Sequence, residues 1–171
     1  TLDTVLDETA GGLNGLISCA EWTGIPLHYL LDEAGLDASA TWVVAEGADA
    51  AGMNRSVPLS LATLDAMLAL YQNGEPLRRS QGFPMRLLVP GCEGNLSVKW
   101  LRSLRVMNQP AHTREETSKY TDLQLDGKAW QFSLRMGVKS VITSPSGQMQ
   151  LPEKGVFEIT GLAWTGHGSV R

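Results

Sequence analysis

Apolar residues recur at helical spacing in two segments of the chain. In 27–34 they repeat every three or four positions, Pro26 stands in the first turn, where its missing N–H costs nothing, and Gly35 is placed as a C-cap. In 61–71 the apolar residues again share one helical face, and Ser60 is a suitable N-cap. The pattern predicts a helix in each of these two segments.

Other apolar runs have the length and residue types of strands. In the first two thirds of the chain, these runs predict strands over 41–45, 55–59, 85–89 and 98–107. The 85–89 run is almost continuously apolar, which is typical of a strand that is buried on both faces.

The character of the chain changes after residue 112. The segment 113–128 is polar and charged, and it is predicted to cross between two domains. Strands are then predicted over 139–143 and 156–160, with a further strand beginning at 162–164. Two or three strands cannot close a β-sandwich, so the second domain is expected to be incomplete.

Composition and charge restrict the function only broadly. A chain of 171 residues can form one good core, or one small and one partial domain. Its net charge of −4 gives no reason to expect a nucleic-acid partner. No apolar run approaches the roughly 20 residues that cross a bilayer, and no signal peptide is visible. The chain starts at Thr1, so a removed leader and an excised piece both remain open.

The two cysteines, Cys19 and Cys92, form neither a disulfide framework nor a zinc motif. Free cysteines are usually buried, and both are predicted to be buried or half-buried thiols.

The chemistry is concentrated around a Gly-rich turn after an apolar strand. The strand of 85–89 carries Arg86, and the turn that follows leads to Ser97-Val98-Lys99. A buried Arg is rare unless it is paired, so either an anion or a core carboxylate must lie near Arg86. A guanidinium and backbone N–H groups both suit phosphate. The segment predicts a site for a phosphate-bearing ligand, with an internal ion pair as the alternative.

Asp49 follows the predicted strand of 41–45 in the turn Glu46-Gly47-Ala48-Asp49. Its carboxylate could accept hydrogen bonds from the amino groups of a ligand. It could equally bond to its own turn, which is common for Asp.

Three motifs resemble the molybdenum-pterin domain of the sulfite oxidase family, and in particular its bacterial sulfane (sulfite) dehydrogenase branch. They are Glu-Trp-Thr-Gly-Ile-Pro-Leu, Gly-Phe-Pro-x-Arg through Val-Lys-Trp-Leu, and Arg-Glu-Glu-Thr-Ser-Lys-Tyr-Thr-Asp. The resemblance implies an α+β molybdopterin-binding domain, N-terminally incomplete, over 1–112. It further implies a linker and the start of an immunoglobulin-like β-sandwich dimerisation domain over 113–171.

The resemblance also implies roles for single residues. Six residues stand at positions that bind molybdopterin in the family. They are Asp49, Gln81, Arg86, Ser97, Val98 and Lys99. Gln81 replaces a His of the vertebrate members, and Gln can bond to the cofactor but not titrate. Tyr120 corresponds to an active-site Tyr, and Arg114 and Lys119 would attract an anionic substrate. Without the resemblance, this charged segment reads as a solvated linker.

No metal ligand is assigned within the chain. The family binds molybdenum through the Cys of a Cys-Ala-Gly-Asn motif, since a soft thiolate suits that metal. The motif is absent from the sequence, and neither Cys19 nor Cys92 stands at its place.

The implied function is molybdenum-dependent oxidation of sulfite or of protein-bound sulfane sulfur, with electrons passing to a c-type cytochrome. The family further implies a periplasmic homo-oligomer without nucleic-acid or membrane partners. The chain by itself is expected to hold part of the pocket and to be inactive. Two alternatives are a cofactor-free interaction module, favoured by the missing Cys motif, and a relative of the methionine-sulfoxide reductase type. The third motif argues against the latter.

Overall fold

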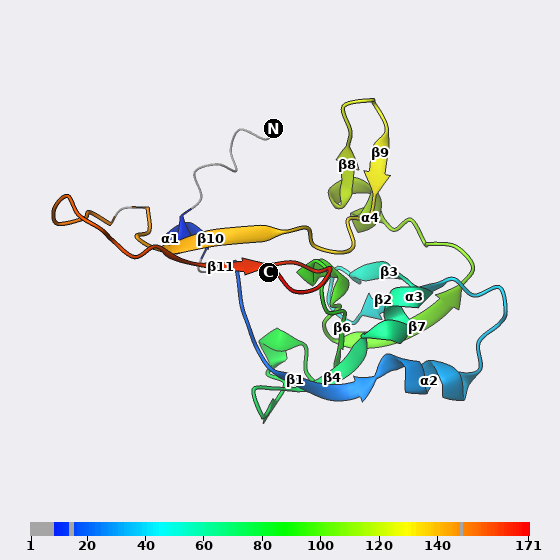
Figure 1. The fold of residues 1–171 in the computed structure, drawn as a ribbon. Helices are drawn as coiled ribbons and strands as arrows, with labels where there is room; N and C mark the ends of the chain where they lie inside the picture. The colour runs from blue at the N-terminus through cyan, green and yellow to red at the C-terminus, as the bar shows by residue number, and fades with distance from the viewer. Residues whose placement is uncertain (1–8, 14–15, 148) are drawn as a thin grey trace. The chain divides into compact units, whose positions relative to one another are not determined.

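A computed structural model describes residues 9–13, 16–147 and 149–171 (Figure 1). The chain divides into two compact units. One is Ala20–Met136, and the other combines Thr1–Cys19 with Gly137–Arg171. The division differs from the boundary after residue 112 that the sequence predicts, because the segment after that residue packs with the larger unit. None of the helices in the described residues is long and apolar enough to cross a membrane.

One sheet of the larger unit has three antiparallel strands in the order β3 (Asn54–Pro58), β2 (Trp42–Gly47) and β7 (Leu101–Met107) (Figure 1). The register pairs Gly47 with Leu101 and Glu46 with Asn54. The end of β2 therefore lies beside the beginnings of β3 and β7. These strands fall where the sequence predicts them.

In the second sheet, β4 (Met67–Gln72) lies between β1 (Trp22–Pro26) on one side and β5 (Glu75–Pro76) and β6 (Arg86–Leu88) on the other. The buried strand predicted over 85–89 is present as β6.

The two predicted helices have different outcomes. The first is present as α2 (Leu27–Ala34), and Gly35 ends it with a φ of 72°. The second prediction is wrong over most of its length, since α3 (Leu59–Leu64) ends at Asp65 and β4 follows. Leu64 and Tyr71 of the supposed helical face are 63% and 43% exposed. The apolar residues of a short run can be spaced to suit either a helix or a strand. Here the pairing of β4 with strands on both sides decides in favour of a strand.

The segment predicted to cross between domains contains a helix, α4 (Arg114–Lys119), and a hairpin of β8 (Thr121–Leu123) and β9 (Ala129–Gln131). Thr113 and Glu116 form a capping box at the start of α4. Glu116 is fully buried and accepts hydrogen bonds from the backbone N–H and the hydroxyl of Ser56 on β3. This carboxylate therefore attaches α4 to the three-stranded sheet.

The core of the larger unit is continuous. Its fully buried apolar side chains come from helices and strands of both sheets and include Leu27, Val43, Ala45, Ala62, Leu87 and Leu96. Two short 3-10 helices, η2 (Arg79–Gln81) and η3 (Gly94–Leu96), flank β6 in the sequence.

The smaller unit contains α1 (Ala10–Leu13) and an antiparallel pair of β10 (Lys139–Ser144) and β11 (Thr160–Trp164). The prediction over 156–160 is wrong except at its last residue, where β11 begins. Pairing of Lys139 with Trp164 sets this register, so the strand falls on the segment predicted to follow it.

Substitution Glu116→Ala is expected to lower the free energy of unfolding by about 3–5 kcal/mol, because it leaves buried donors without an acceptor and removes a buried charge that faces Arg55. Urea unfolding followed by circular dichroism measures the effect. The control is Glu115→Ala in the same helix, where the lost ion pair to Arg114 lies at the surface. Equal stability of the two variants would contradict the anchoring role.

Candidate functional site

Three strand ends bring two of the predicted cofactor residues, Asp49 and Lys99, to one end of the β3–β2–β7 sheet. The N–H of Ala48, just after β2, donates to the carbonyl of Trp100 at 2.8 Å. The N–H of Gly47 donates to the carbonyl of Met53 at 2.8 Å, which closes the turn that carries Asp49. The Asp49 turn therefore lies beside the Lys99-Trp100 segment that leads into β7.

Gly47 is required at this contact. A Cβ atom there would lie 2.7 Å from the carbonyl oxygen of Lys99, which is closer than real side chains approach a backbone. Asp49 Oδ1 accepts the N–H of Met53 at 3.1 Å. The local turn bond considered for Asp49 is thus present, and the side chain remains partly exposed beside residues 99 and 100.

Arg86 is a buried cation held by backbone carbonyls. Nη2 donates to the carbonyl of Ser97 at 2.8 Å and Nη1 to that of Gln81 at 3.2 Å. Its guanidinium carbon lies 5.0 Å from the centre of the Trp22 ring. Nε is buried without a hydrogen-bond partner, and burial lowers the pKa of Arg86. No ion pair to Arg86 exists among the described residues, so the internal acid considered as an alternative is not found there.

Lys99 lies next to Arg86. Its Nζ donates to the carbonyl of Ser80 at 2.9 Å, and Trp100 Nε1 donates to that of Arg79 at 2.8 Å. Gly82 has a φ of +108°, and a Cβ atom there would lie 3.0 Å from Lys99 Cβ and 3.2 Å from Arg86 Cβ. A glycine at position 82 therefore allows the two cationic side chains to come together. We call Gln81, Gly82, Arg86 and Lys99 the cationic cradle.

Ser97 and Val98 directly precede Lys99, and the carbonyl of Ser97 accepts from Arg86. Both are buried, and their N–H groups donate to the carbonyls of Gly94 and Leu96. Ser97 Oγ accepts a hydrogen bond from the N–H of Val89 at 3.1 Å. The carbonyl of Val98 accepts one from the N–H of Leu87 at 2.9 Å. These two residues hold β6 against the segment that carries Lys99.

The residues predicted to contact substrate lie on and beside α4. Tyr120 is the C-cap of this helix, and the guanidinium carbon of Arg55 lies 4.2 Å from the centre of its ring. Arg114 and Lys119 are both exposed, and Arg114 pairs with Glu115 at 3.4 Å. The structure thus joins Tyr120 to β3 but leaves Arg114 and Lys119 in solvent.

Sequence reasoning missed two buried charges, Arg55 and Glu116. A signal was available for each. Thr113-x-x-Glu116 has the spacing of a capping box, and Arg55 lies two positions from Val57, on the same face of a strand.

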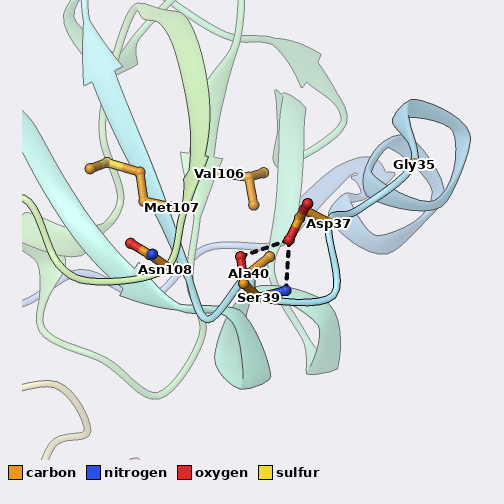
Figure 2. A pocket seen from close by; sticks show the side chains of 7 residues that line it. All are labelled: Gly35, Asp37, Ser39, Ala40, Val106, Met107 and Asn108. Carbon is orange, nitrogen blue, oxygen red and sulfur yellow. Dashed lines mark hydrogen bonds between the residues drawn. The ribbon is translucent and has the colours of Figure 1, made fainter.

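The described residues also include a shallow surface pocket, at the opposite end of β7 from Leu101 (Figure 2). A strand of seven residues spans about 20 Å, so the pocket is remote from the cradle. Asp37 accepts the N–H and the hydroxyl of Ser39 at 2.8 and 2.6 Å, and these bonds lower the pKa of Asp37. The pocket contains none of the predicted site residues.

The described residues contain no group of three His, Cys, Asp or Glu side chains placed to bind a metal ion. Cys92 is buried as predicted, whereas the burial predicted for Cys19 is wrong, since that residue is exposed. Burial raises the pKa of the Cys92 thiol.

Comparison with known proteins gives consistent matches. A family model for the oxidoreductase molybdopterin binding domain matches residues 6–115. Mitochondrial sulfite oxidase of Mus musculus is 33% identical over 170 residues, which cover 90% of this chain and 31% of the relative. The NAD(P)H nitrate reductase of Hordeum vulgare is 31% identical over 183 residues, which cover 90% of this chain and 20% of the relative. The crystal structure of the sulfane dehydrogenase SoxCD from Paracoccus pantotrophus has 50% identity, a TM-score of 0.81, and coverage of 87% of this chain and 39% of that chain.

The chain therefore belongs to the oxidoreductase molybdopterin-binding domain family. Its likeness to sulfite oxidases and to the sulfane dehydrogenase confirms the family predicted from the three motifs. The domain is of the sulfite oxidase type, with mixed helix and strand content. The chain spans 31% of the length of the mouse sulfite oxidase and 39% of the matched sulfane dehydrogenase chain.

Membership of this family implies a molybdenum–molybdopterin cofactor. The cationic cradle fits such a group. Arg86 Nε is buried without an acceptor, and neither Arg86 nor Lys99 is neutralised by an acid among the described residues. Two cations side by side at a loop are suited to a ligand that carries phosphate.

Substitution Gly82→Ala is expected to destabilise the domain by about 1–3 kcal/mol and to reduce the pterin content of the purified protein, because the added Cβ meets Lys99 and Arg86 at a positive φ. Thermal unfolding and the fluorescence of released pterin measure both effects. Gly94→Ala is the control, since a Cβ there has no neighbour within 4 Å. A Gly82→Ala variant that matches this control would refute the close approach.

Proposed function

We propose that the cationic cradle binds the phosphate group of molybdopterin in an enzyme that oxidises sulfite or protein-bound sulfane sulfur. The observation that carries the proposal is the pair of Arg86 and Lys99, two adjacent cations without an acidic partner among the described residues. Burying a guanidinium without a countercharge is unfavourable, and an anionic ligand supplies that charge.

Each residue of the site has a separate task. Arg86 and Lys99 bind the phosphate, while the side chains of Gln81 and Asp49 hydrogen-bond to the polar edge of the pterin ring. The family resemblance also assigns Ser97 and Val98 to the cofactor. Because their N–H groups already donate to Gly94 and Leu96, we propose that they serve it indirectly, by keeping β6 and the Lys99 segment at a constant separation.

When bound, the cofactor supplies a two-electron oxidation at sulfur. Tyr120 lies at the end of α4, where its O–H donates a hydrogen bond to an oxygen of the substrate. Arg114 and Lys119 are exposed cations of the same helix, and they raise the local concentration of an anionic substrate.

The similar proteins support a wider assignment. We infer that electrons leave for a c-type cytochrome, that the protein is a periplasmic homo-oligomer, and that residues from 113 onward lead into an immunoglobulin-like dimerisation domain. The 50% identity with the sulfane dehydrogenase SoxCD favours sulfane sulfur or sulfite as substrate.

A second candidate is an interaction module that keeps the fold without the cofactor. One observation favours it: the Nη atoms of Arg86 and the Nζ of Lys99 already donate to backbone carbonyls, which hold the two cations without a ligand. Metal analysis separates the two candidates. Well-folded full-length protein with neither molybdenum nor pterin would establish the module.

Substitution Arg86→Met is expected to lower the molybdenum and pterin content of the full-length protein about tenfold or more, since a charge-assisted phosphate contact contributes roughly 1.5–3 kcal/mol. Elemental analysis and pterin fluorescence measure it. Arg78→Met is the matched control, because Arg78 is an exposed cation that pairs with Glu75. Unchanged cofactor content in Arg86→Met would remove the basis of the proposed site.

Substitution Tyr120→Phe is expected to lower kcat/KM about 10- to 100-fold, because one hydrogen bond to the reacting group is lost. Steady-state assays of the full-length protein with sulfite, thiosulfate and methionine sulfoxide measure it. We expect turnover of the sulfur anions and none of methionine sulfoxide. Turnover of methionine sulfoxide alone would instead identify a reductase.

A further inference from the structure

Arg55 is the most unusual buried group of the larger unit. It is the second residue of β3, pairs with Ala45 of β2, and has no solvent exposure. All three of its guanidinium nitrogens are buried without a hydrogen-bond partner. Such a group is costly to bury, and it therefore requires an explanation.

The guanidinium of Arg55 lies over the ring of Tyr120. Its central carbon lies 4.2 Å from the centre of the Tyr120 ring, which is the stacking distance of a cation on an aromatic face. Burial lowers the pKa of Arg55, and the nearby carboxylate of Glu116 opposes that shift. The oxygens of Glu116 are hydrogen-bonded to Ser56 and Thr113, so Glu116 balances the charge without binding the guanidinium.

The backbone on both sides of Tyr120 is anchored independently of Arg55. Glu116 attaches α4 to Ser56 of β3, and the hydroxyl of Thr121 donates to the carbonyl of Glu116 at 2.8 Å. These bonds place the Cα of Tyr120, but they do not orient its ring. The contact with Arg55, in contrast, is made by the ring itself.

We propose that Arg55 is a positioning residue for Tyr120: its planar guanidinium orients the ring so that the phenol O–H points to the substrate. This rests on the proposed function, which gives Tyr120 its contact with the sulfur substrate. An apolar side chain would fill the same volume at lower cost, and a Lys would supply the charge without the flat surface. The choice of Arg at this buried position is explained by the flat surface.

The main test variant is Arg55→Lys in the full-length, cofactor-loaded protein, because it keeps the charge that faces Glu116. A second variant, Arg55→Met combined with Glu116→Gln, removes both charges together, which avoids an unpaired buried carboxylate. The matched control is Arg102→Lys on β7 of the same sheet, where the Arg is exposed and pairs with Glu46. Uniform 3-fluorotyrosine labelling gives a fluorine NMR spectrum, in which Tyr120→Phe identifies the Tyr120 resonance.

We expect Arg55→Lys to shift the Tyr120 resonance and to lower kcat/KM about tenfold, consistent with a desolvated stacking contact of ~1–2 kcal/mol. Combined with Tyr120→Phe, it should cause no further loss beyond that of Tyr120→Phe alone, since both changes act through the same hydroxyl. Arg102→Lys should change neither measurement.

An unchanged resonance, or additive losses in the double variant, would overturn the positioning role. Loss of the fold in both Arg55 variants would also overturn it and assign Arg55 to stability. If the wild-type protein oxidises no sulfur compound, the proposed function fails. The fluorine resonance then still decides whether Arg55 orients Tyr120.

Discussion

The segment of residues 97–101 is the part of the domain on which the site depends, because it is hydrogen-bonded on both sides. On the side of β6, the carbonyl of Val98 accepts a hydrogen bond from the N–H of Leu87, and the N–H of Leu101 donates to the carbonyl of Met85. Toward β2 the carbonyl of Trp100 accepts from Ala48. One short segment thereby joins the two sheets and sets the separation of Arg86, Lys99 and the Asp49 turn. Glycines at 47 and 82 permit these approaches, since a Cβ atom at 47 would lie 2.7 Å from a carbonyl oxygen and one at 82 would crowd Lys99 and Arg86 at 3.0 and 3.2 Å.

Buried charges distinguish this region from the apolar core around it. Arg86 is held by carbonyls and by the ring of Trp22, whereas Arg55 stacks on Tyr120 and faces Glu116. A stable fold would be simpler with apolar residues at these positions. Arg55 near the start of β3 and Arg86 at the start of β6 agree with a domain whose family binds a phosphorylated, redox-active cofactor.

The elements predicted correctly are those with unambiguous local signals, such as the helix that follows Pro26 and ends at Gly35. The helix over 61–71 was predicted wrongly because helical spacing in a short apolar run also suits a strand that is paired on both sides. The segment 113–128 was predicted as a linker from its polar composition, because a polar segment is ordinarily solvated. The capping box of Thr113 and Glu116, which indicates a helix, was given less weight. Burial of Glu116 depends on Ser56, 60 positions earlier, which no local pattern contains.

The sequence by itself determined the family, the residue types of the cradle, and the buried strand that places an Arg beside a Gly-rich turn. These follow from short-range spacing, where neighbouring residues dictate backbone geometry. Only the tertiary structure decided that Gly82 lies between Arg86 and Lys99, that Arg86 has no acidic partner among the described residues, and that Arg55 stacks on Tyr120. The physical reason is that desolvation and stacking depend on which distant segments of the chain come into contact. The register of the strands determines those contacts.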